Sequence, residues 1–375
     1  MTEQQAFLIL NALPNIGPIT LNRLLTDLGG DPRAVFSATK ARLEQVRGVG
    51  PAISATILDW AQHFSLEREE ARLAQAHAVF VTHREAGYPS LLREIHDPPI
   101  GLYRKGGYTF DQPCLAIVGS RKTTLYGQKV AKQLAGELVQ RGFCIVSGLA
   151  RGIDTAAHEG ALEAGGVTAA VLGTGIDIIY PPENLALYRR IEERGAIVTE
   201  FPFGRRADRQ SFAMRNRIVA GMCAGVIVVE TDVAGGSMIT ARFAGEQGRL
   251  VFAVPGRIDQ PTSAGCHQLI RDGATLLTSV DDVLNEFSYL DGLRPAPIPA
   301  KPGGEGAGSA AGAAAAGLKP DEAQVWACFN GGELLTPDSI AQQTGMPAAE
   351  VAVALMMLEL KRLVAKRADG TYEPC

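Results

Sequence analysis

The sequence lacks several features that would assign a function directly. Its formal net charge is only -4 over 375 residues, so the chain as a whole does not attract polyanions and any nucleic acid must be bound by a local basic patch. None of the six cysteines stands in a Cys-x-x-Cys pair, and the six histidines are scattered. We therefore expect reduced thiols, no metal site and no disulfide framework.

Long apolar runs are also missing. None reaches the roughly 18 residues that a membrane-spanning helix needs, and the N-terminus, MTEQQAFLIL, has neither the basic segment nor the cleavage site of a secretory signal. These absences predict a cytoplasmic protein that does not enter a membrane. The ordinary balance of 46% hydrophobic and 20% charged residues predicts two or three globular domains.

The common nucleotide-binding motifs are incomplete. A P-loop needs Gly-Lys followed by Ser or Thr, and this triplet does not occur. The turn Gly173-Thr174-Gly175 lacks the third glycine of Gly-x-Gly-x-x-Gly, and no acidic residue in a suitable context follows about 20 residues later to bind a ribose. We expect no cofactor.

Composition and periodicity predict four parts: a helical domain at 1–75, an α/β domain at 76–288, a linker at 289–318 and a small domain at 319–375. The first part contains two glycine-containing loops, 13–18 and 46–51. Such loops are typical of SAM-like or helix-hairpin-helix modules, whose backbone N–H groups contact DNA phosphates. A plain helical bundle, in which Gly and Pro only end helices, explains the pattern equally well. The predicted helices are 5–12, 20–28, 31–36, 40–46 and 52–64.

In the second part, short β-branched runs alternate with amphipathic helices. This alternation predicts an extended Rossmann-like fold with a doubly wound, mostly parallel sheet. The predicted strands are 78–82 and 100–104 at the edge, then 115–118, 143–147, 167–172, 196–199, 225–229 and 250–254. The predicted helices are 125–141, 155–164, 184–193, 210–222 and 238–247. The sequence does not fix a dimer surface, although the apolar residues of 218–229 and of the strand and helix nearby are candidates for one.

The linker is rich in Pro, Gly and Ala and has almost no large apolar side chain with which to order itself. Three predicted helices follow it, at 321–329, 337–344 and 347–361. A hairpin at 363–373, turning at Asp369-Gly370, completes the pattern of a winged helix.

Small, hydroxyl and basic residues follow the predicted strands. Because the carboxyl ends of parallel strands meet at one edge of a sheet, their N–H groups and hydroxyls are expected to converge on an anion. The candidate binding residues in these turns are Gly119, Ser120, Arg121, Lys122, Ser147, Gly148, Arg151, Gly173, Thr174, Gly175, Gly236 and Ser237.

Further arginines belong to the same predicted edge, chiefly Arg209, Arg215 and Arg217. Arginine suits both phosphate binding and stacking on unpaired bases. The alternative is that these arginines form salt bridges with nearby carboxylates. The carboxylates in question are Asp177, Glu200, Asp208 and Glu230, and the interleaved Phe201, Phe203 and Phe212 belong either to the binding surface or to the core.

No catalytic arrangement emerges. His158 lies within a predicted helix with no nucleophile beside it, which favours a structural histidine. His267 and its neighbour Cys266 share one short segment and cannot act as a nucleophile and base pair. Glu200 and Asp177 are explained as well by capping or by pairing with arginine. We therefore predict a protein that is not an enzyme.

Seven segments together resemble the DprA (Smf) family of DNA-processing proteins over about residues 75–288. The segments are 117–121 (IVGSR), 147–154 (SGLARGID), 180–184 (YPPEN), 215–221 (RNRIVAG), 236–241 (GSMITA), 251–256 (VFAVPG) and 265–274 (GCHQLIRDGA). The flanking helical and winged-helix parts agree with the same family more loosely.

The resemblance implies a bacterial, dimeric protein that binds and protects single-stranded DNA and loads the RecA recombinase onto it during natural transformation. It also implies that Arg121 binds a phosphate and that Arg209 lines the DNA groove. Several relatives carry a lysine after Tyr-Pro, where this chain has Pro182. That contact is expected to be absent here or to come from Arg189 or Arg190.

Two other functions stay open at this point. The segment Ala234-Gly235-Gly236-Ser237 before a helix is somewhat similar to the phosphate-binding turn of nucleoside-monophosphate phosphoribohydrolases, although it lacks that turn's proline and Gly-Thr pair. This similarity suggests a nucleotide-binding or nucleotide-hydrolysing enzyme. A scaffold that mainly contacts RecA is the other alternative.

Overall fold

The computed structural model describes residues 1–288, 318–329, 335–361, 363–366 and 370–374. The chain divides into two compact units, Met1–Ala296 and Pro297–Cys375. The predicted linker, apart from Leu318, lies outside the described residues, so the proposed division into four parts stays a prediction. Within the described residues, no helix combines the length and the hydrophobicity needed to cross a membrane.

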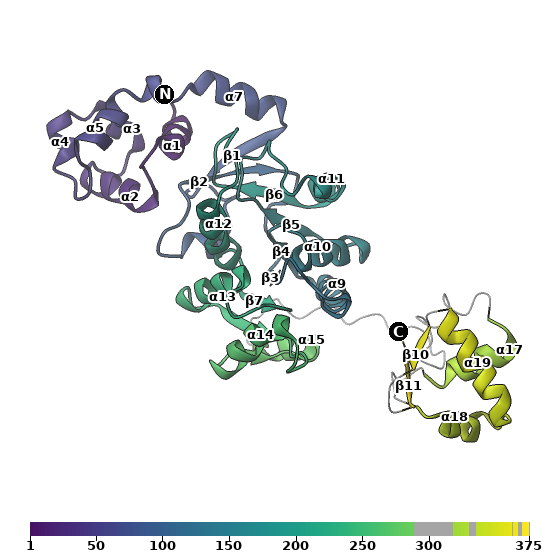
Figure 1. The fold of residues 1–375 in the computed structure, drawn as a ribbon. Helices are drawn as coiled ribbons and strands as arrows, with labels where there is room; N and C mark the ends of the chain where they lie inside the picture. Colours follow the sequence, from purple (N-terminus) through teal and green to yellow (C-terminus); the bar gives the residue numbers. More distant parts are fainter. Residues whose placement is uncertain (289–317, 330–334, 362, 367–369, 375) are drawn as a thin grey trace. The chain divides into compact units, whose positions relative to one another are not determined.

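A nine-stranded sheet organises the first unit, in the order β1-β2-β6-β5-β4-β3-β7-β8-β9 (Figure 1). In this spatial order, each strand from β6 through β3 to β9 is parallel to the next. Strand β2 is antiparallel to both of its neighbours, β1 and β6. The bounds are β1 Ala78–Thr82, β2 Gly101–Lys105, β3 Cys114–Val118, β4 Cys144–Ser147, β5 Thr168–Val171, β6 Ala196–Thr199, β7 Gly225–Val228, β8 Leu250–Ala253 and β9 Thr275–Leu276.

The order of these strands confirms the doubly wound sheet. The chain runs outward from β3 through β4 and β5 to β6, and then returns to place β7 on the other side of β3. The direction of winding therefore reverses between β3 and β7, where open α/β sheets form a crevice at the carboxyl ends of their strands. All five residues of β3 are buried, as are all four of β7, because helices cover both faces of these strands.

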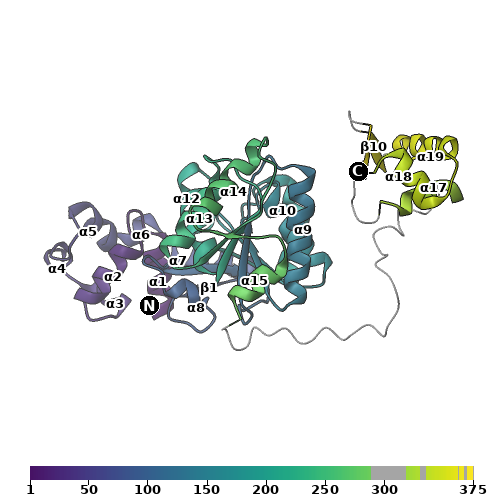
Figure 2. The ribbon, with the colours of Figure 1, turned by 90° about the horizontal axis from the view of Figure 1, so that it is seen from below.

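Two groups of helices cover the faces of the sheet (Figure 2). One face packs against α9 (Leu125–Gln140), α10 (Ile153–Glu163) and α15 (Val280–Glu286). The other packs against α12 (Arg209–Gly221), α13 (Gly236–Glu246) and α14 (Pro261–Arg271), with α8 (Ser90–Arg93) beside them. Residues Ile218, Val226 and Val228 belong to this second core. These three side chains of the candidate dimer segment 218–229 fill the core between helix and sheet, so they are not available to a dimer surface.

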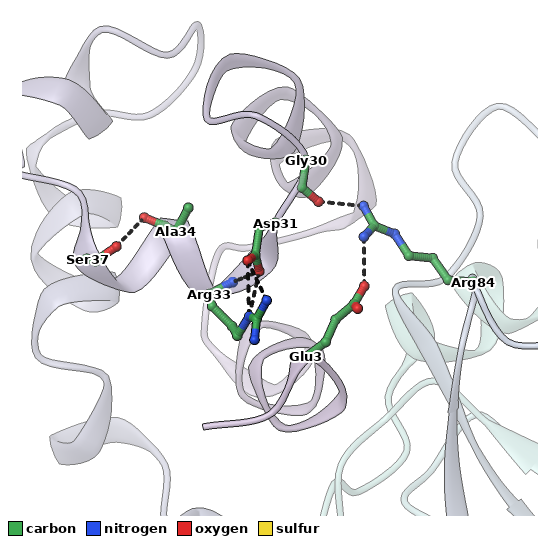
Figure 3. A network of polar contacts seen from close by, with 7 residues as sticks. All are labelled: Glu3, Gly30, Asp31, Arg33, Ala34, Ser37 and Arg84. Atoms are coloured by element: carbon green, nitrogen blue, oxygen red, sulfur yellow. Dashed lines mark hydrogen bonds and ion pairs between the residues drawn. The ribbon is translucent and has the colours of Figure 1, made fainter.

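The N-terminal helices pack against β1, β2 and α11 (Leu185–Arg194) around Phe7, Leu24 and Tyr103. Their bounds are α1 Glu3–Ala12, α2 Pro18–Asp27, α3 Pro32–Ser37, α4 Lys40–Glu44, α5 Pro51–Leu58, α6 Trp60–His63 and α7 Leu66–Gln75. Arg84, two residues after β1, connects these helices to the sheet. Its guanidinium donates to the Glu3 carboxylate at 2.7 Å and to the Gly30 carbonyl at 2.7 Å (Figure 3).

Two features of these helices differ from the sequence-based prediction. The helix expected at 52–64 is broken at Asp59, whose backbone (φ -100, ψ 26) separates α5 from α6 and lets Trp60 pack edge-on against Phe36. Helix α7 was not predicted, because its sequence, LEREEARLAQ, is highly charged and contains only two large apolar residues, Leu66 and Leu73. It is held instead by Glu69, whose buried carboxylate accepts hydrogen bonds from the Tyr103 hydroxyl and the Phe203 N–H.

The second unit has the predicted winged-helix arrangement. It contains α17 (Pro320–Ala327), α18 (Pro337–Thr344), α19 (Ala348–Leu360) and a hairpin of β10 (Val364–Lys366) with β11 (Tyr372–Pro374). Leu335 forms an isolated bridge to Tyr372. A core that includes Val325, Ile340 and Leu355 joins the three helices to the hairpin.

Candidate nucleic-acid interface

A hollow of about 790 Å³ opens where the winding of the sheet reverses. Its walls come from the turn after β3, the first turns of α10 and α13, one side of α12 and the segment after β7. The lining includes Gly119, Ser120, Arg121, Lys122, Asp154, Phe212, Arg215, Asn216, Thr231, Asp232, Gly236, Ser237 and Thr262. The structure thus brings together predicted site residues from three separate segments, the turn after β3, α12 and the start of α13.

Arg121 and Phe212 form the exposed wall of this hollow. The Arg121 guanidinium lies over the Phe212 ring, 5.0 Å from its centroid, and the Tyr180 ring packs on the same phenylalanine at 5.5 Å. Arg121 itself is exposed, and Phe212 is half-buried. Because a guanidinium stacked on an aromatic ring keeps its N–H edges available, Arg121 can bind a phosphate while Phe212 presents an aromatic surface.

Arg215 forms part of the floor of the hollow and is only 4% exposed. Its Nη1 donates to the Val171 carbonyl at 3.2 Å, and its Nε has no hydrogen-bond partner among the described residues. Burial lowers the pKa of this guanidinium, and the nearby Asp154 carboxylate acts in the opposite direction. Arg215 also explains why residue 148 is a glycine, because a Cβ at this position would lie 1.2 Å from Arg215 Nη1.

The N–H groups expected to converge on an anion are largely bonded within the protein. The Asp154 carboxylate accepts from the Gly148 N–H at 3.2 Å and from the Ala150 N–H at 3.4 Å. The Ser120 N–H donates to the Glu230 carbonyl, and the Gly175 N–H donates to the Arg205 carbonyl. The turns after β3, β4 and β5 therefore offer few free N–H groups to an anion, and the predicted contacts of their glycines with DNA stay predictions.

Glu230 occupies the N-terminus of α9, where a Rossmann protein commonly binds a phosphate. Its carboxylate, 3% exposed, accepts from the Thr123 hydroxyl at 2.6 Å and from the Thr124 N–H at 2.9 Å. A Cβ on Gly127 would lie 2.3 Å from Glu230 Oε2, so the glycine is needed to admit the carboxylate. The protein's own negative charge therefore takes the helix N-terminus that a nucleotide phosphate would need.

Helix α13 begins differently. Its N-cap is Gly235, and no side chain among the described residues caps it. Gly236 is exposed at the hollow, whereas the Ser237 hydroxyl is buried and donates to Thr231 Oγ1 at 2.7 Å. Of these two candidate residues, Gly236 thus offers accessible backbone and Ser237 mainly holds the turn together.

Several candidate residues do not line the hollow. Ser147 is fully buried and donates to the Ile117 carbonyl, and the Thr174 hydroxyl donates to the Ile178 carbonyl. Gly173 and Gly175 are buried, with Phe212 and the Pro202 carbonyl too close to admit a side chain at either position. These residues shape the sheet edge below the hollow, and their predicted contacts with DNA stay predictions.

Two of the arginines are engaged in ion pairs. Arg217 is 5% exposed and pairs with Glu200 at 2.5 Å and with Asp97 at 3.3 Å, which is the salt-bridge alternative left open by the sequence. Burial raises the pKa of Glu200, and Arg217 counteracts this rise. Arg151 is exposed and pairs with Glu183. A phosphate would have to compete with Glu183 for Arg151, whereas Arg217 is held beneath the surface.

Three further basic residues considered in the sequence analysis, Arg209, Arg189 and Arg190, lie on helices. Arg209 begins α12 after the N-cap Asp208, on the helix that also carries Phe212 and Arg215. Arg189 and Arg190 are exposed on α11 and do not line the hollow. Pro182 begins a short 3-10 helix, Pro182–Asn184. Whether the family's lysine contact is absent or comes from one of these arginines stays a prediction.

Sequence reasoning missed the roles of two carboxylates that organise the site. Asp154 lies in the first turn of α10, where an acidic residue commonly accepts hydrogen bonds from free N–H groups, and this position was a signal that could have found it. Glu230 was named only as a possible partner of an arginine, and its bonds to Thr123 and Thr124 join segments more than 100 residues apart, so no local pattern indicates them. Sequence reasoning also missed the role of Asn216, whose side chain donates to the Gly236 carbonyl at 3.3 Å and so ties α12 to the start of α13.

The fold and the hollow define an α/β protein with a doubly wound sheet and an arginine- and phenylalanine-lined crevice at the reversal of strand order. A family model described as "DNA recombination-mediator protein A" matches residues 79–288, and another described as "DprA winged helix domain" matches residues 309–370. The chain belongs to the DNA recombination-mediator protein A (DprA) family.

Individual relatives agree with this assignment. The chain is 34% identical to Protein Smf of Escherichia coli over 361 residues, covering 92% of each protein. The X-ray structure of DprA from Streptococcus pneumoniae superposes with a TM-score of 0.62 at 37% identity and covers 71% of this chain and 93% of that one. A structure of DprA from Helicobacter pylori, described for its single-stranded DNA binding mode, gives a TM-score of 0.51 at 31% identity and covers 57% of this chain and 97% of that one.

Proposed function

We propose that this protein binds single-stranded DNA across the hollow between β3 and β7. The observation that carries the proposal is the exposed Arg121 guanidinium stacked on Phe212, with the buried Arg215 on the floor. Together they offer charge for the phosphate backbone and an aromatic face for an unpaired base. A duplex hides its base faces, so the aromatic wall favours a single strand. The H. pylori relative's reported binding of single-stranded DNA supports the same conclusion.

Fluorescence anisotropy with labelled oligonucleotides tests this site. Arg121→Ala should weaken binding to oligo-dT and to mixed sequences alike, by roughly tenfold or more, since hydrogen bonds to charged groups contribute about 1.5–3 kcal/mol. Phe212→Leu keeps an apolar side chain but removes the stacking face, which is worth about 1–3 kcal/mol per base.

The matched control is Lys129→Ala. Lys129 is exposed on α9 and lies outside the lining of the hollow, so its loss removes one positive charge elsewhere and should leave the dissociation constant nearly unchanged. Equal affinity of Arg121→Ala and the wild type would remove Arg121 from the site. A Phe212→Leu variant that binds normally would show that the bases do not stack there.

We also propose that the bound strand is protected and passed to RecA during natural transformation and that the protein acts as a homodimer. The description of the family as a recombination mediator supports this role. The same Arg121→Ala variant gives a second readout, because it should lose stimulation of RecA-dependent strand exchange in proportion to its loss of DNA binding.

Catalysis is not part of this proposal. A nucleotide-hydrolysing enzyme with this fold would need helix N-termini open to phosphate, and Glu230 occupies the one at α9. The start of α13 is the part of the hollow that still resembles a phosphate-binding turn. Release of free base from nucleoside monophosphates, detected by chromatography, would establish the enzymatic alternative.

A further inference from the structure

Helix α19 of the winged-helix unit carries an exposed apolar stripe. Val353 is 60% exposed, Met356 55% and Leu360 72%, and Ala349 is exposed one turn before Val353. At about 100° per residue, these four positions fall within about 60° of one another and extend over roughly 16 Å of helix. The opposite side of α19 is already used, because Val351, Ala354, Leu355 and Leu358 are buried in the core of the unit.

The composition of α19 does not suit DNA. In a DNA-binding winged helix the corresponding helix enters the major groove, and positive charge supplies most of the affinity. The segment Ala348–Leu360 contains no Lys or Arg and has two glutamates, Glu350 and Glu359. An apolar stripe beside two negative charges is instead typical of a protein contact.

The stripe is complementary to itself. Its members repeat at intervals of four, three and four residues, the pattern by which helices pair through alternate a and d positions. The point midway between residues 354 and 355 is the centre of the stripe. It lies halfway between Ala349 and Leu360 and also halfway between Val353 and Met356. An antiparallel two-fold pair therefore places the small Ala349 against the large Leu360 of a second copy, and Val353 against its Met356, so that the sizes match along the seam.

The charges flanking the stripe are compatible with this pairing. Glu350 and Glu359 lie about 90° from the centre of the stripe, on opposite sides. A two-fold axis brings like side against like side, so each glutamate shares a side with its own copy in the second helix. The two copies lie nine positions apart, roughly 13 Å along the seam, and do not meet. Both stay at the solvent edge of the seam.

We propose that α19 is a self-association surface, which joins the winged-helix units of two copies of this chain through an antiparallel pair of helices. The stripe is short, so the pair is weak in isolation and is strengthened when the two chains are held close together, for example on one DNA strand. The winged helix then connects neighbouring chains rather than reading DNA.

Cysteine cross-linking of the full chain tests both the contact and its direction. Two differently tagged proteins, Val353→Cys and Met356→Cys, are mixed in a background of Cys328→Ser and Cys375→Ser and then oxidised. The antiparallel pair predicts disulfides between the two different proteins at least tenfold more abundant than disulfides within either kind. A matched control uses Gln343→Cys in place of Met356→Cys, since Gln343 is exposed on α18 away from the stripe, and should give little product.

A second substitution shows whether the stripe drives the contact. Leu360→Glu, added to both cysteine proteins, should abolish the mixed disulfide, whereas Gln343→Glu adds the same charge on α18 and should leave it intact. Leu360 is largely exposed, so thermal unfolding should be unchanged. Preferential disulfides between identical proteins, cross-links from residue 353 to the first unit of the same chain, or insensitivity to Leu360→Glu would each overturn the proposal. So would loss of affinity for duplex DNA in Leu360→Glu without loss of cross-linking.

Discussion

His158 shows how strongly the interior beneath the hollow constrains single residues. The ring is fully buried on α10, Nδ1 lies 2.7 Å from Thr168 Oγ1, and Nε2 has no partner among the described residues. Burial, together with the positive charge of Arg215, lowers the pKa of His158 to about 3. The histidine is therefore neutral in the folded protein at any physiological pH, as expected of a structural residue.

Because His158 is neutral in the folded protein, we predict that the free energy of unfolding falls as the pH is lowered from neutral. Between the folded pKa of about 3 and the ordinary unfolded value of about 6.5, the unfolded chain binds one more proton than the folded chain, so stability falls as the pH falls. The contribution lost between pH 7 and pH 5.5 is about 1 kcal/mol. Urea unfolding of the first unit measures it. His158→Gln should flatten this part of the pH profile, whatever its effect on stability at pH 7.

The control for this measurement is His63→Gln. His63 is exposed at the end of α6, so this variant makes the same substitution at a ring that is not buried. A His158→Gln profile that kept the full acid-side slope would mean that another group titrates in this range.

The arginines illustrate what sequence reasoning can and cannot resolve at a single residue. Arg121 follows directly after β3, so its place at the edge of the sheet was predictable from the strand alone. Arg215 and Arg217 lie two residues apart on α12, and their environments differ because one reaches over Gly148 while the other meets Glu200. Such differences depend on the packing of distant segments, and no local pattern encodes them.

At the scale of elements, the central strands were predictable because they are short, apolar and covered on both faces. Every strand from β3 to β8 lies within one residue of its predicted bounds at each end. The two-residue strand β9 and the helices α7, α8, α14 and α15 were missed. Strand β9 is stabilised mainly by pairing with β8, and the charged helix α7 by the buried Glu69.

The start of α9 is the element on which the site most depends. Glu230 accepts bonds from Thr123 and Thr124 directly after the Arg121 turn. Replacing its carboxylate by an amide in Glu230→Gln places an NH2 group among donors. We expect a loss of about 1–3 kcal/mol in unfolding free energy, measured by urea denaturation, together with weaker binding of single-stranded DNA because the Arg121 turn loosens.

Glu137→Gln is the matched control for Glu230→Gln. Glu137 is exposed on α9 itself and accepts one hydrogen bond, from the Gln133 side chain. This control should change stability by a few tenths of a kcal/mol at most. If Glu230→Gln were as stable as Glu137→Gln, the carboxylate would not be the group that holds the start of α9.

At the scale of the whole molecule, charge is the feature that distinguishes this chain from a generally basic DNA-binding protein. The net charge is -4, and the hollow combines Arg121, Lys122 and Arg215 with Asp154 and Asp232. Within the hollow, positive charge is thus confined to three side chains, and only a few phosphates of a bound strand can be neutralised there.

This confinement predicts a modest dependence of DNA binding on salt. For single strands the slope of log K against log salt is about -0.7 per phosphate neutralised. Two or three contacts in the hollow give a slope of about -1.5 to -2, so affinity for oligo-dT should fall by about tenfold between 50 and 200 mM NaCl. Arg121→Ala should reduce the steepness of the slope by about 0.7, because one contact is lost. A slope near zero would contradict phosphate binding, and a slope steeper than about -4 would show that basic residues well outside the hollow carry the strand.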